Sequence, residues 1–270
     1  MKYFEGCTAL ITGASSGLGA EFARQLAPYA RGLILVARRN ERLEELASEL
    51  RGIHPGLTVR TYCADLARED LRTQLVAWLQ KEDIAVDFLI NNAGIGDHGK
   101  FQDGDWNRVR AMLDVNIAAL THLTHLLVPG LLRGGRAAIL NVSSVAGFFP
   151  LPHMAVYSAT KAYVTSFSEA LALELRPRGI TVTALCPGPV PTEFFDIATR
   201  EGERDAVAHF KTFPAMVVTP QEAVAAGLRA VAARRARVVP GPLLAAAVGV
   251  ALVIPFFVLR RILAWKADSI

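Results

Sequence analysis

The sequence is poor in cysteine and has no pattern that would use the few it has. Its 270 residues include three cysteines, Cys7, Cys63 and Cys186, which are far apart and never in a C-x-x-C spacing. An odd, scattered set excludes a disulfide scaffold and a cysteine-based zinc site, and it predicts small apolar side chains in a reducing compartment. No other cluster of metal-ligating residues stands out, so we expect no metal.

A strong charge of one sign is also lacking. The formal net charge is +4, and the basic residues are spread along the chain, which argues against a nucleic-acid surface. Hydrophobic residues make up 52% of the chain and charged residues 20%, which excludes disorder and predicts an extensive core. The chain opens MKYFEGCTALITGASS, without the pattern of a secretory signal. We therefore expect a cytoplasmic protein.

Short apolar runs alternate with stretches of helical spacing as far as about residue 240. Continuous apolar strands are typical of a parallel sheet that helices cover on both faces. We predict an α/β fold with a single doubly wound Rossmann domain over 1–240, six to seven strands, and ligands beyond the carboxyl ends of the strands. The predicted strands are TALIT (8–12), LILVA (33–37), TVRTYCA (58–64), VDFLIN (86–91), AAILNV (137–142), ITVTALCPG (180–188) and RVVP (237–240). The predicted helices include 17–27, 66–81, 107–132, 155–176 and 219–235.

A hydrophobic tail follows this domain. Residues 242–259 carry no charge, and basic residues flank them on both sides. Eighteen apolar residues lie near the lower limit for a membrane span, and Gly249 and Pro255 interrupt the run. Three interpretations stay open for the extension 241–270: a membrane anchor, an interface element, or a helical segment. We favour a helical segment that covers the substrate site or contacts a membrane surface through 242–266.

A glycine-rich loop, TGASSGLG (12–19), closes the first predicted strand and opens the first predicted helix. Glycines allow a tight turn and a close backbone approach, and the helix N-terminus offers free N–H groups to a pyrophosphate. A tight turn without a ligand is the alternative. The position in the first strand–helix unit favours nucleotide binding.

Several motifs in a fixed order resemble the short-chain dehydrogenase/reductase family. They are TGASSGLG, NNAG (91–94), Asn116, Ser144, YSATK (157–161) and PGPVPT (187–192). The resemblance covers about residues 6–240, and ARRNERL and PGPVPTEF are most similar to a bacterial branch that prefers NADPH. It implies an oxidoreductase that interconverts a carbonyl group and a secondary or primary alcohol.

The end of the second strand indicates which cofactor is bound. An NAD enzyme usually carries an acidic residue there, whereas this chain has Ala37, Arg38 and Arg39. A guanidinium binds a 2′-phosphate, which a carboxylate would repel. We expect NADP(H), held by Arg38 with help from Ser15, and we interpret Arg39 as a solvated residue at a helix start.

The resemblance implies further cofactor contacts. Asp65 matches the position that receives the adenine amino group, with a helix N-cap as the alternative. Asn91, Ala93 and Gly94 match the positions that line the adenosine ribose and stabilise the central sheet, and Asn92 is more typical of a structural residue. The full implied set is Gly13, Ser15, Ser16, Gly17, Leu18, Gly19, Arg38, Asp65, Asn91, Ala93, Gly94, Tyr157, Lys161, Pro187, Gly188, Val190 and Thr192.

The catalytic group implied by the resemblance is Asn116, Ser144, Tyr157 and Lys161. Reduction of a ketone needs a hydride for carbon and a proton for oxygen, and a free tyrosine is too weak an acid for that proton. Lys161 lies one helical turn from Tyr157, so its ammonium, together with the positive nicotinamide of the oxidised cofactor, is expected to lower the tyrosine pKa. Ser144 would orient the substrate carbonyl. Asn116 would hold a water that links Lys161 to solvent.

The remaining expectations concern the substrate and partners. Residues 190–215 match the family's substrate lid, and their phenylalanines, with Phe148, Phe149 and Met154, favour an apolar substrate. A homodimer or homotetramer is the family's default. The alternative function is a catalytically silent regulator or scaffold that binds the cofactor, against which the complete Ser–Tyr–Lys–Asn set argues.

Overall fold

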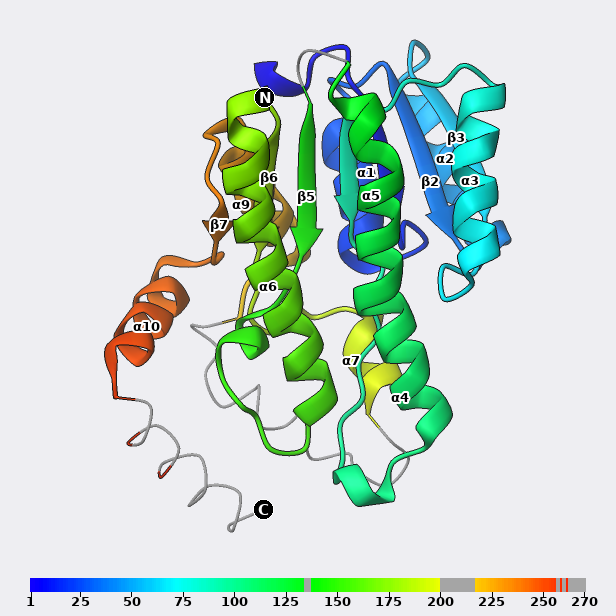
Figure 1. Ribbon diagram of the computed structural model, residues 1–270. Coiled ribbons are helices and arrows are strands. Elements are labelled where there is room, and N and C mark those ends of the chain that lie inside the picture. The colour runs from blue at the N-terminus through cyan, green and yellow to red at the C-terminus, as the bar shows by residue number, and fades with distance from the viewer. Residues whose placement is uncertain (134–136, 200–216, 256–257, 259–260, 262–270) are drawn as a thin grey trace.

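Seven strands form one parallel sheet in the order β3-β2-β1-β4-β5-β6-β7 (Figure 1). The structure is a computed structural model that describes residues 1–133, 137–199, 217–255, 258 and 261. The predicted doubly wound parallel sheet is confirmed over these residues. The strands are β1 (Thr8–Thr12), β2 (Gly32–Ala37), β3 (Thr58–Cys63), β4 (Phe88–Asn91), β5 (Ala138–Val142), β6 (Thr181–Leu185) and β7 (Arg237–Val238).

Helices cover both faces of the sheet, and strands β1, β2, β4, β5 and β6 are buried along their whole length. In β1, Ala9 and Ile11 point into one core and Leu10 into the other. The first core lies under α1 (Gly17–Leu26), α2 (Asn40–Ile53) and α9 (Pro220–Ala232). The second lies under α3 (Glu69–Lys81), α5 (Leu120–Leu131) and α6 (Ala155–Leu175).

The stretch predicted as one helix over 107–132 has a more irregular structure. It consists of α4 (Trp106–Leu113), a π-helical turn η3 (Asp114–Ala119) and α5. The buried Asn116 lies in the π turn and binds the backbone of Ile95 instead of solvent. Such single-turn widenings occur frequently at functional sites.

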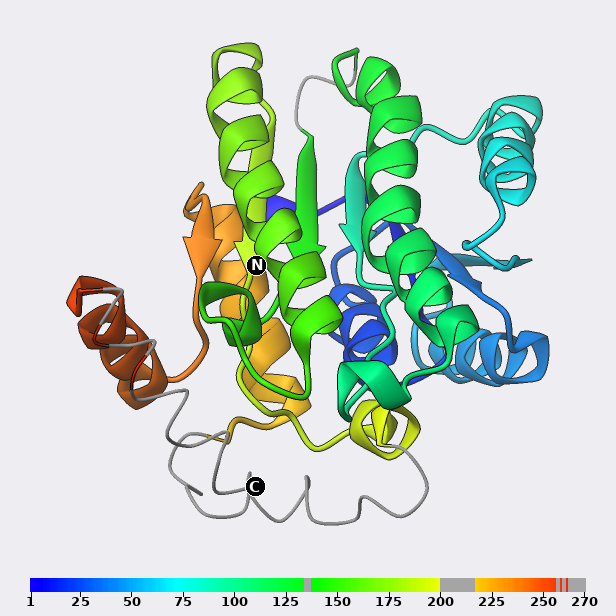
Figure 2. The ribbon, with the colours of Figure 1, turned by 60° about the horizontal axis from the view of Figure 1, so that its bottom comes forward.

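The carboxyl ends of the strands meet at one edge, where the arrowheads point in Figure 1. The 3₁₀ turn η4 (Val145–Phe148) and α7 (Glu193–Ala198) also lie at this edge. Figure 2 brings the same edge forward and shows α7 across it. Of the predicted lid 190–215, residues 200–215 lie outside the described residues, and Phe210 and Phe213 lie there too.

The C-terminal helix α10 (Pro242–Val253) follows β7 and projects from the side of the domain (Figures 1 and 2). Leu243, Val250 and Val253 are exposed by 60%, 63% and 80%. A helix of this length spans about 18 Å, short of the ~30 Å of a bilayer core. Among the described residues, the helical run Trp106–Leu131 is long and apolar enough to cross a membrane, but its C-terminal half α5 packs in the core.

Candidate active site

A cavity of about 570 Å³ opens at the carboxyl edge of the sheet. Its walls come from the loops that follow β1, β2, β3, β4, β5 and β6, and from the start of α6. Most of the residues predicted for the site meet in this cavity. They are Gly13, Ser15, Ser16, Gly17, Leu18, Arg38, Asp65, Ala93, Gly94, Ser144, Tyr157, Lys161, Pro187, Gly188, Val190 and Thr192.

The glycine loop is held against the end of β4. Gly13 adopts a φ of +67°, and a Cβ there would lie 2.9 Å from the Cα of Ala93. Asn92 donates from Nδ2 to the carbonyls of Thr12 (2.9 Å) and Gly13 (3.2 Å), so it has the structural contacts that its sequence predicted. Gly19 does not line the cavity, but a Cβ there would come within 2.2 Å of the Gly13 oxygen. Gly19 therefore lets α1 pack directly on the loop.

Arg38 and Asp65 lie on the cavity wall beyond β2 and β3. Arg38 is exposed. The Asp65 carboxylate accepts a hydrogen bond from the Ala67 N–H at 3.1 Å, while α3 starts later, with Arg68 as its N-cap. The interpretation of Asp65 as a helix N-cap is therefore wrong. Its carboxylate closes a local turn.

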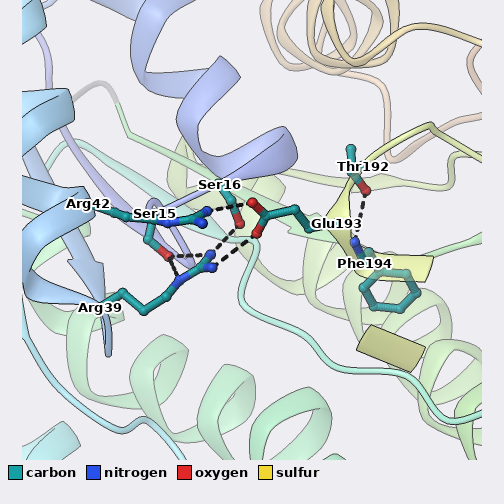
Figure 3. Close-up of polar contacts among 7 residues, drawn as sticks. All are labelled: Ser15, Ser16, Arg39, Arg42, Thr192, Glu193 and Phe194. Carbon is teal, nitrogen blue, oxygen red and sulfur yellow. Dashed lines mark hydrogen bonds and ion pairs between the residues drawn. The ribbon is translucent and has the colours of Figure 1, made fainter. Parts of the chain in front are cut away.

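Arg39 is more than a solvated residue, contrary to our interpretation of the sequence. Its guanidinium donates to the hydroxyls of Ser15 (3.2 Å) and Ser16 (2.7 Å) and pairs with Glu193 at 3.0 Å (Figure 3). Sequence reasoning missed Arg39 and Glu193, although both line the cavity. The available signals were the second arginine after β2 and the acid directly after the predicted site residue Thr192.

Asn91 lies apart from the other predicted cofactor residues. It does not line the cavity, and its side chain is buried below the end of β4. Nδ2 donates to Thr124 Oγ1 at 3.0 Å and to Asn141 Oδ1 at 2.9 Å, and Asn141 donates in turn to Ser168. These bonds connect β4, β5, α5 and α6. The geometry fits the sheet-stabilising part of its predicted role, and the side chain does not reach a ribose site in the cavity.

Ser144, Tyr157 and Lys161 converge on one side of the cavity. All three are buried and line the cavity, and the Ser144 hydroxyl donates to the Pro187 carbonyl at 3.5 Å. The Lys161 ammonium lies 5.7 Å from the centre of the Tyr157 ring and donates to the Val142 carbonyl at 2.9 Å. The neighbouring Ser143 instead donates to the Lys161 carbonyl at 2.8 Å. The Ser143 hydroxyl is thus engaged with the backbone of α6.

Burial sets the electrostatics of this group. Burial raises the pKa of Tyr157 to about 12, and the hydrogen bond with Ser144 offsets only part of that rise. Burial also lowers the pKa of Lys161 to about 8. In the chain alone, desolvation dominates both pKa values, and the tyrosine pKa lies above its usual range. The lower tyrosine pKa expected with the oxidised cofactor bound stays a prediction.

The turn η4 fixes Ser144 relative to Lys161. Ser144 is the N-cap of this turn, and its Oγ accepts from the Ala146 N–H at 3.1 Å. A Cβ on Gly147 would lie 2.6 Å from the Lys161 carbonyl carbon. The backbone of η4 therefore rests directly on α6 at Lys161.

Asn116 stands behind the cavity and does not line it. Its Oδ1 accepts from the Ile95 N–H, and its Nδ2 donates to the Ile95 carbonyl and to Thr160, all at 2.9–3.0 Å. A Cβ on Gly94 would lie 3.3 Å from Asn116 Oδ1 and 3.4 Å from Lys161 Nζ. Asn116 thus holds the strand-end loop that separates it from Lys161.

The loop after β6 forms the opposite wall. The Pro187 carbonyl accepts from the Val145 N–H at 2.9 Å, which ties this loop to η4. Thr192 Oγ1 accepts from the Phe194 N–H at 3.4 Å at the start of α7. Pro187, Gly188, Val190 and Thr192 therefore form a continuous wall that reaches from η4 to α7.

The part of the cavity next to Tyr157 is apolar. Phe149 and Met154, which the sequence proposed for the substrate site, line it, whereas Phe148 packs beneath the Arg237 guanidinium at 5.2 Å. The Phe194 ring lies 5.6 Å from the Tyr157 ring. Sequence reasoning missed the lining residues Ile95 and Leu151. No described residue of the tail 242–259 lines the cavity, so these residues do not cover it as expected.

The donor set suits a dinucleotide. The cavity extends from the exposed Arg38 and the glycine loop to the Tyr157 group, and glycines at 13, 17 and 94 leave its floor to the backbone. A Cβ at position 94 would crowd both Asn116 and Lys161, so the floor is open where a ribose would approach the ammonium. Across the described residues, no group of three or more His, Cys, Asp or Glu could hold a metal ion.

Known proteins are similar to this chain in sequence and in fold. Residues 7–202 match the family described as short chain dehydrogenase. Sulfoacetaldehyde reductase 2 of Chromohalobacter salexigens is 39% identical over 192 residues, covering 70% of this chain and 75% of that protein. A short-chain dehydrogenase from Sphingobium yanoikuyae, in complex with NADPH, is 38% identical with a TM-score of 0.78, covering 91% of this chain and 92% of that one. A Burkholderia phymatum short chain dehydrogenase/reductase, in complex with NAD, is 28% identical with a TM-score of 0.79, covering 92% and 93%.

Proposed function

The chain belongs to the short-chain dehydrogenase family, and we propose that it is an NADP(H)-dependent oxidoreductase that interconverts a carbonyl group and an alcohol by hydride transfer. The observation that carries this proposal is the meeting of Ser144, Tyr157 and Lys161 in the same cavity as the glycine loop. We assign residues 1–240 to the catalytic domain and 241–270 to an extension.

The nucleotide would lie along the glycine loop, with its pyrophosphate at the N-terminus of α1. Of the similar structures, one holds NADPH and another NAD, so the preference of this chain depends on its own residues. Ala37 leaves no carboxylate at the end of β2, and the exposed Arg38 follows it on the cavity wall. A guanidinium there favours a ribose that carries a 2′-phosphate. We therefore propose NADP(H).

The bound nicotinamide supplies or accepts the hydride. Tyr157 is the general acid and base that exchanges a proton with the substrate oxygen, and Ser144, which lines the same cavity, polarises that oxygen. Lys161 places an ammonium beside the tyrosine ring and beneath the ribose position at Gly94. Asn116 keeps the Ile95 backbone in place behind this pair.

Different walls of the cavity would hold the pyrophosphate and the nicotinamide carboxamide of the cofactor. Ser15, Ser16 and Leu18 contact the nucleotide near the glycine loop, and Asp65 contacts the adenine from the loop after β3. The loop after β6, with Val190 and Thr192 on the cavity wall, would hold the nicotinamide carboxamide and so fix which face presents hydride. These assignments rest on the placement of the residues around one cavity.

An apolar carbonyl compound is the substrate class that the walls favour. Phe149, Leu151, Met154 and Phe194 surround the space beside Tyr157 and offer no charge to a substrate. Burial of an apolar substituent against such walls stabilises the complex by roughly 25 cal/mol per Å².

One assay tests the proposal. Oxidation of NADPH, followed by the loss of its absorbance, is measured with a panel of ketones, aldehydes and acyl thioesters of increasing apolar size. We expect turnover that improves with apolar size. Tight NADPH binding without turnover of any member, in either direction, would instead indicate a silent cofactor-binding regulator.

We further propose a homodimer or homotetramer in the cytoplasm, peripheral to membranes through its C-terminal segment. Leu113 and Leu173 are exposed on the α4–α6 side by 37% and 72%, which favours a subunit contact there. Helix α10 buries Leu244 and Val248, but it exposes the apolar residues Leu243, Val250, Leu252 and Val253, which favours contact with a lipid surface. Sedimentation of the full chain tests the oligomer. Membrane fractionation of the full chain, compared with a variant that ends at residue 241, tests the membrane contact.

A further inference from the structure

Glu193 connects two segments that lie far apart in the sequence. Its carboxylate pairs with Arg39 at 3.0 Å and with Arg42 at 2.5 Å, from α7 to the start of α2 (Figure 3). Hydrogen bonds from the two arginines hold the pKa of the Glu193 carboxyl below its usual range, so the group is ionised at neutral pH.

The same Arg39 guanidinium also contacts the glycine loop. It donates to Ser16 at 2.7 Å and to Ser15 at 3.2 Å, and Figure 3 shows it between these hydroxyls and the carboxylate. Ser15, Ser16, Arg39 and Glu193 all line the cavity. The carboxylate is thus an anion bound at the edge of the proposed nucleotide site, by Arg42 and by the same Arg39 that contacts Ser15.

The Glu193 carboxylate would oppose the binding of an anionic ligand at this edge in two ways. The ligand would be repelled by the charge of Glu193, and it would compete for donors that Glu193 already occupies. A phosphate monoester carries more negative charge than a carboxylate and accepts more hydrogen bonds, so it can displace it. A ligand without that phosphate gains nothing by displacing it.

We propose that Glu193 is a built-in competitor of the cofactor's 2′-phosphate for Arg39 and Arg42, and that it thereby sets how strongly the protein prefers the phosphorylated cofactor. This inference rests on the proposed function, because it requires an adenosine nucleotide in the cavity. It assigns Arg42, which lies outside the cavity lining, a part in cofactor choice.

The solvent exposure of these three side chains sets the size of the expected effect on 2′-phosphate binding. The side chains of Glu193, Arg39 and Arg42 are exposed by 43%, 41% and 45%, so solvent screens each pair. Removal of the Glu193 charge should therefore tighten binding of a 2′-phosphate by about threefold, the range of exposed ion pairs. The gain should shrink as salt is added.

Two nucleotide fragments separate the 2′-phosphate from the rest of the cofactor. Adenosine 2′,5′-bisphosphate and adenosine 5′-monophosphate are titrated by calorimetry into the full chain, at low and at high salt. The variants are Glu193→Gln and the control Glu49→Gln, which removes the same charge from an exposed ion pair with Arg24, outside the cavity.

The inference predicts that E193Q binds the bisphosphate about threefold more tightly than the wild type and binds the monophosphate with unchanged affinity. E49Q should change neither affinity. Equal effects on both fragments, or weaker bisphosphate binding by E193Q, would overturn it and leave the proposed function intact. Failure of the wild-type chain to bind either fragment would overturn both. If the wild type does not discriminate but E193Q favours the bisphosphate, the inference holds and the proposed NADP(H) preference fails.

Discussion

Lys161 and Tyr157 lie side by side on the wall of the cavity, with the ammonium nitrogen 5.7 Å from the centre of the tyrosine ring. Both side chains are buried, and burial favours their neutral forms. It lowers the pKa of the lysine to about 8 and raises the pKa of the tyrosine to about 12. The pair is therefore poised with a protonated tyrosine and a lysine whose charge is easily lost.

Replacement of Tyr157 by phenylalanine should lower turnover by about a thousandfold, the usual contribution of a positioned general acid. NADPH binding should stay nearly unchanged, because the ring remains. Steady-state kinetics and a fluorescence titration measure the two. Tyr163→Phe is the matched control, since Tyr163 lies on the same helix outside the cavity and bonds to Thr121. Full turnover by Tyr157→Phe would contradict the assignment.

The reductive kcat/KM should fall as pH rises through about 8. The Lys161 pKa of about 8 means that the ammonium is present below this pH and lost above it. Tyr157 cannot cause the decline, because it stays protonated up to about pH 12. Any activity left in Lys161→Arg should lack the decline, since a guanidinium stays charged. A profile for the wild type that is flat to pH 10 would rule out this role of the ammonium.

NADPH should be preferred over NADH by at least about tenfold in kcat/KM, because a guanidinium binds the 2′-phosphate that distinguishes them. Arg38→Ala should remove most of this preference through a higher KM for NADPH alone. Arg60→Ala, which breaks an exposed ion pair with Glu82 outside the cavity, should leave it intact. Equal use of both cofactors by the wild type would show the prediction to be wrong.

Alanine at Gly19 should destabilise the fold by about 2 kcal/mol, a typical cost of overpacking. The new Cβ would lie 2.2 Å from the Gly13 carbonyl oxygen, so the loop or α1 must move. Gly52→Ala is the control: nothing lies within 4 Å of a Cβ at this exposed position in α2, and the change should stabilise by about 0.5 kcal/mol. Urea unfolding of both variants measures the difference. Similar stabilities for the two would contradict the packing argument.

The strands could be predicted because their sequences leave little choice. A run such as LILVA buries every side chain, so it indicates a sheet covered on both faces, and the structure has β2 there with all six residues buried. The meeting of Ser144 and Tyr157 in one cavity could also be predicted, since the end of β5 and the start of α6 can both be located from the sequence.

Side-chain partners across the fold could not be predicted in the same way. The contact of Arg39 with Glu193 joins residues 154 positions apart, and nothing local to either one indicates the other. In the π turn, the Asn116 side chain binds Ile95, which lies 21 residues earlier in the chain. The high tyrosine pKa reflects desolvation by the whole cavity wall, whereas the sequence showed only the lysine one turn away.

The lack of a side chain at Gly147 also decides which positions around the cavity can be changed in an engineered variant and which cannot. Any side chain at 147 would push η4 off α6 and separate Ser144 from Lys161. A mutant library for new substrates should therefore keep position 147 as glycine and diversify Phe149, Leu151 and Met154, which line the same cavity beyond that turn.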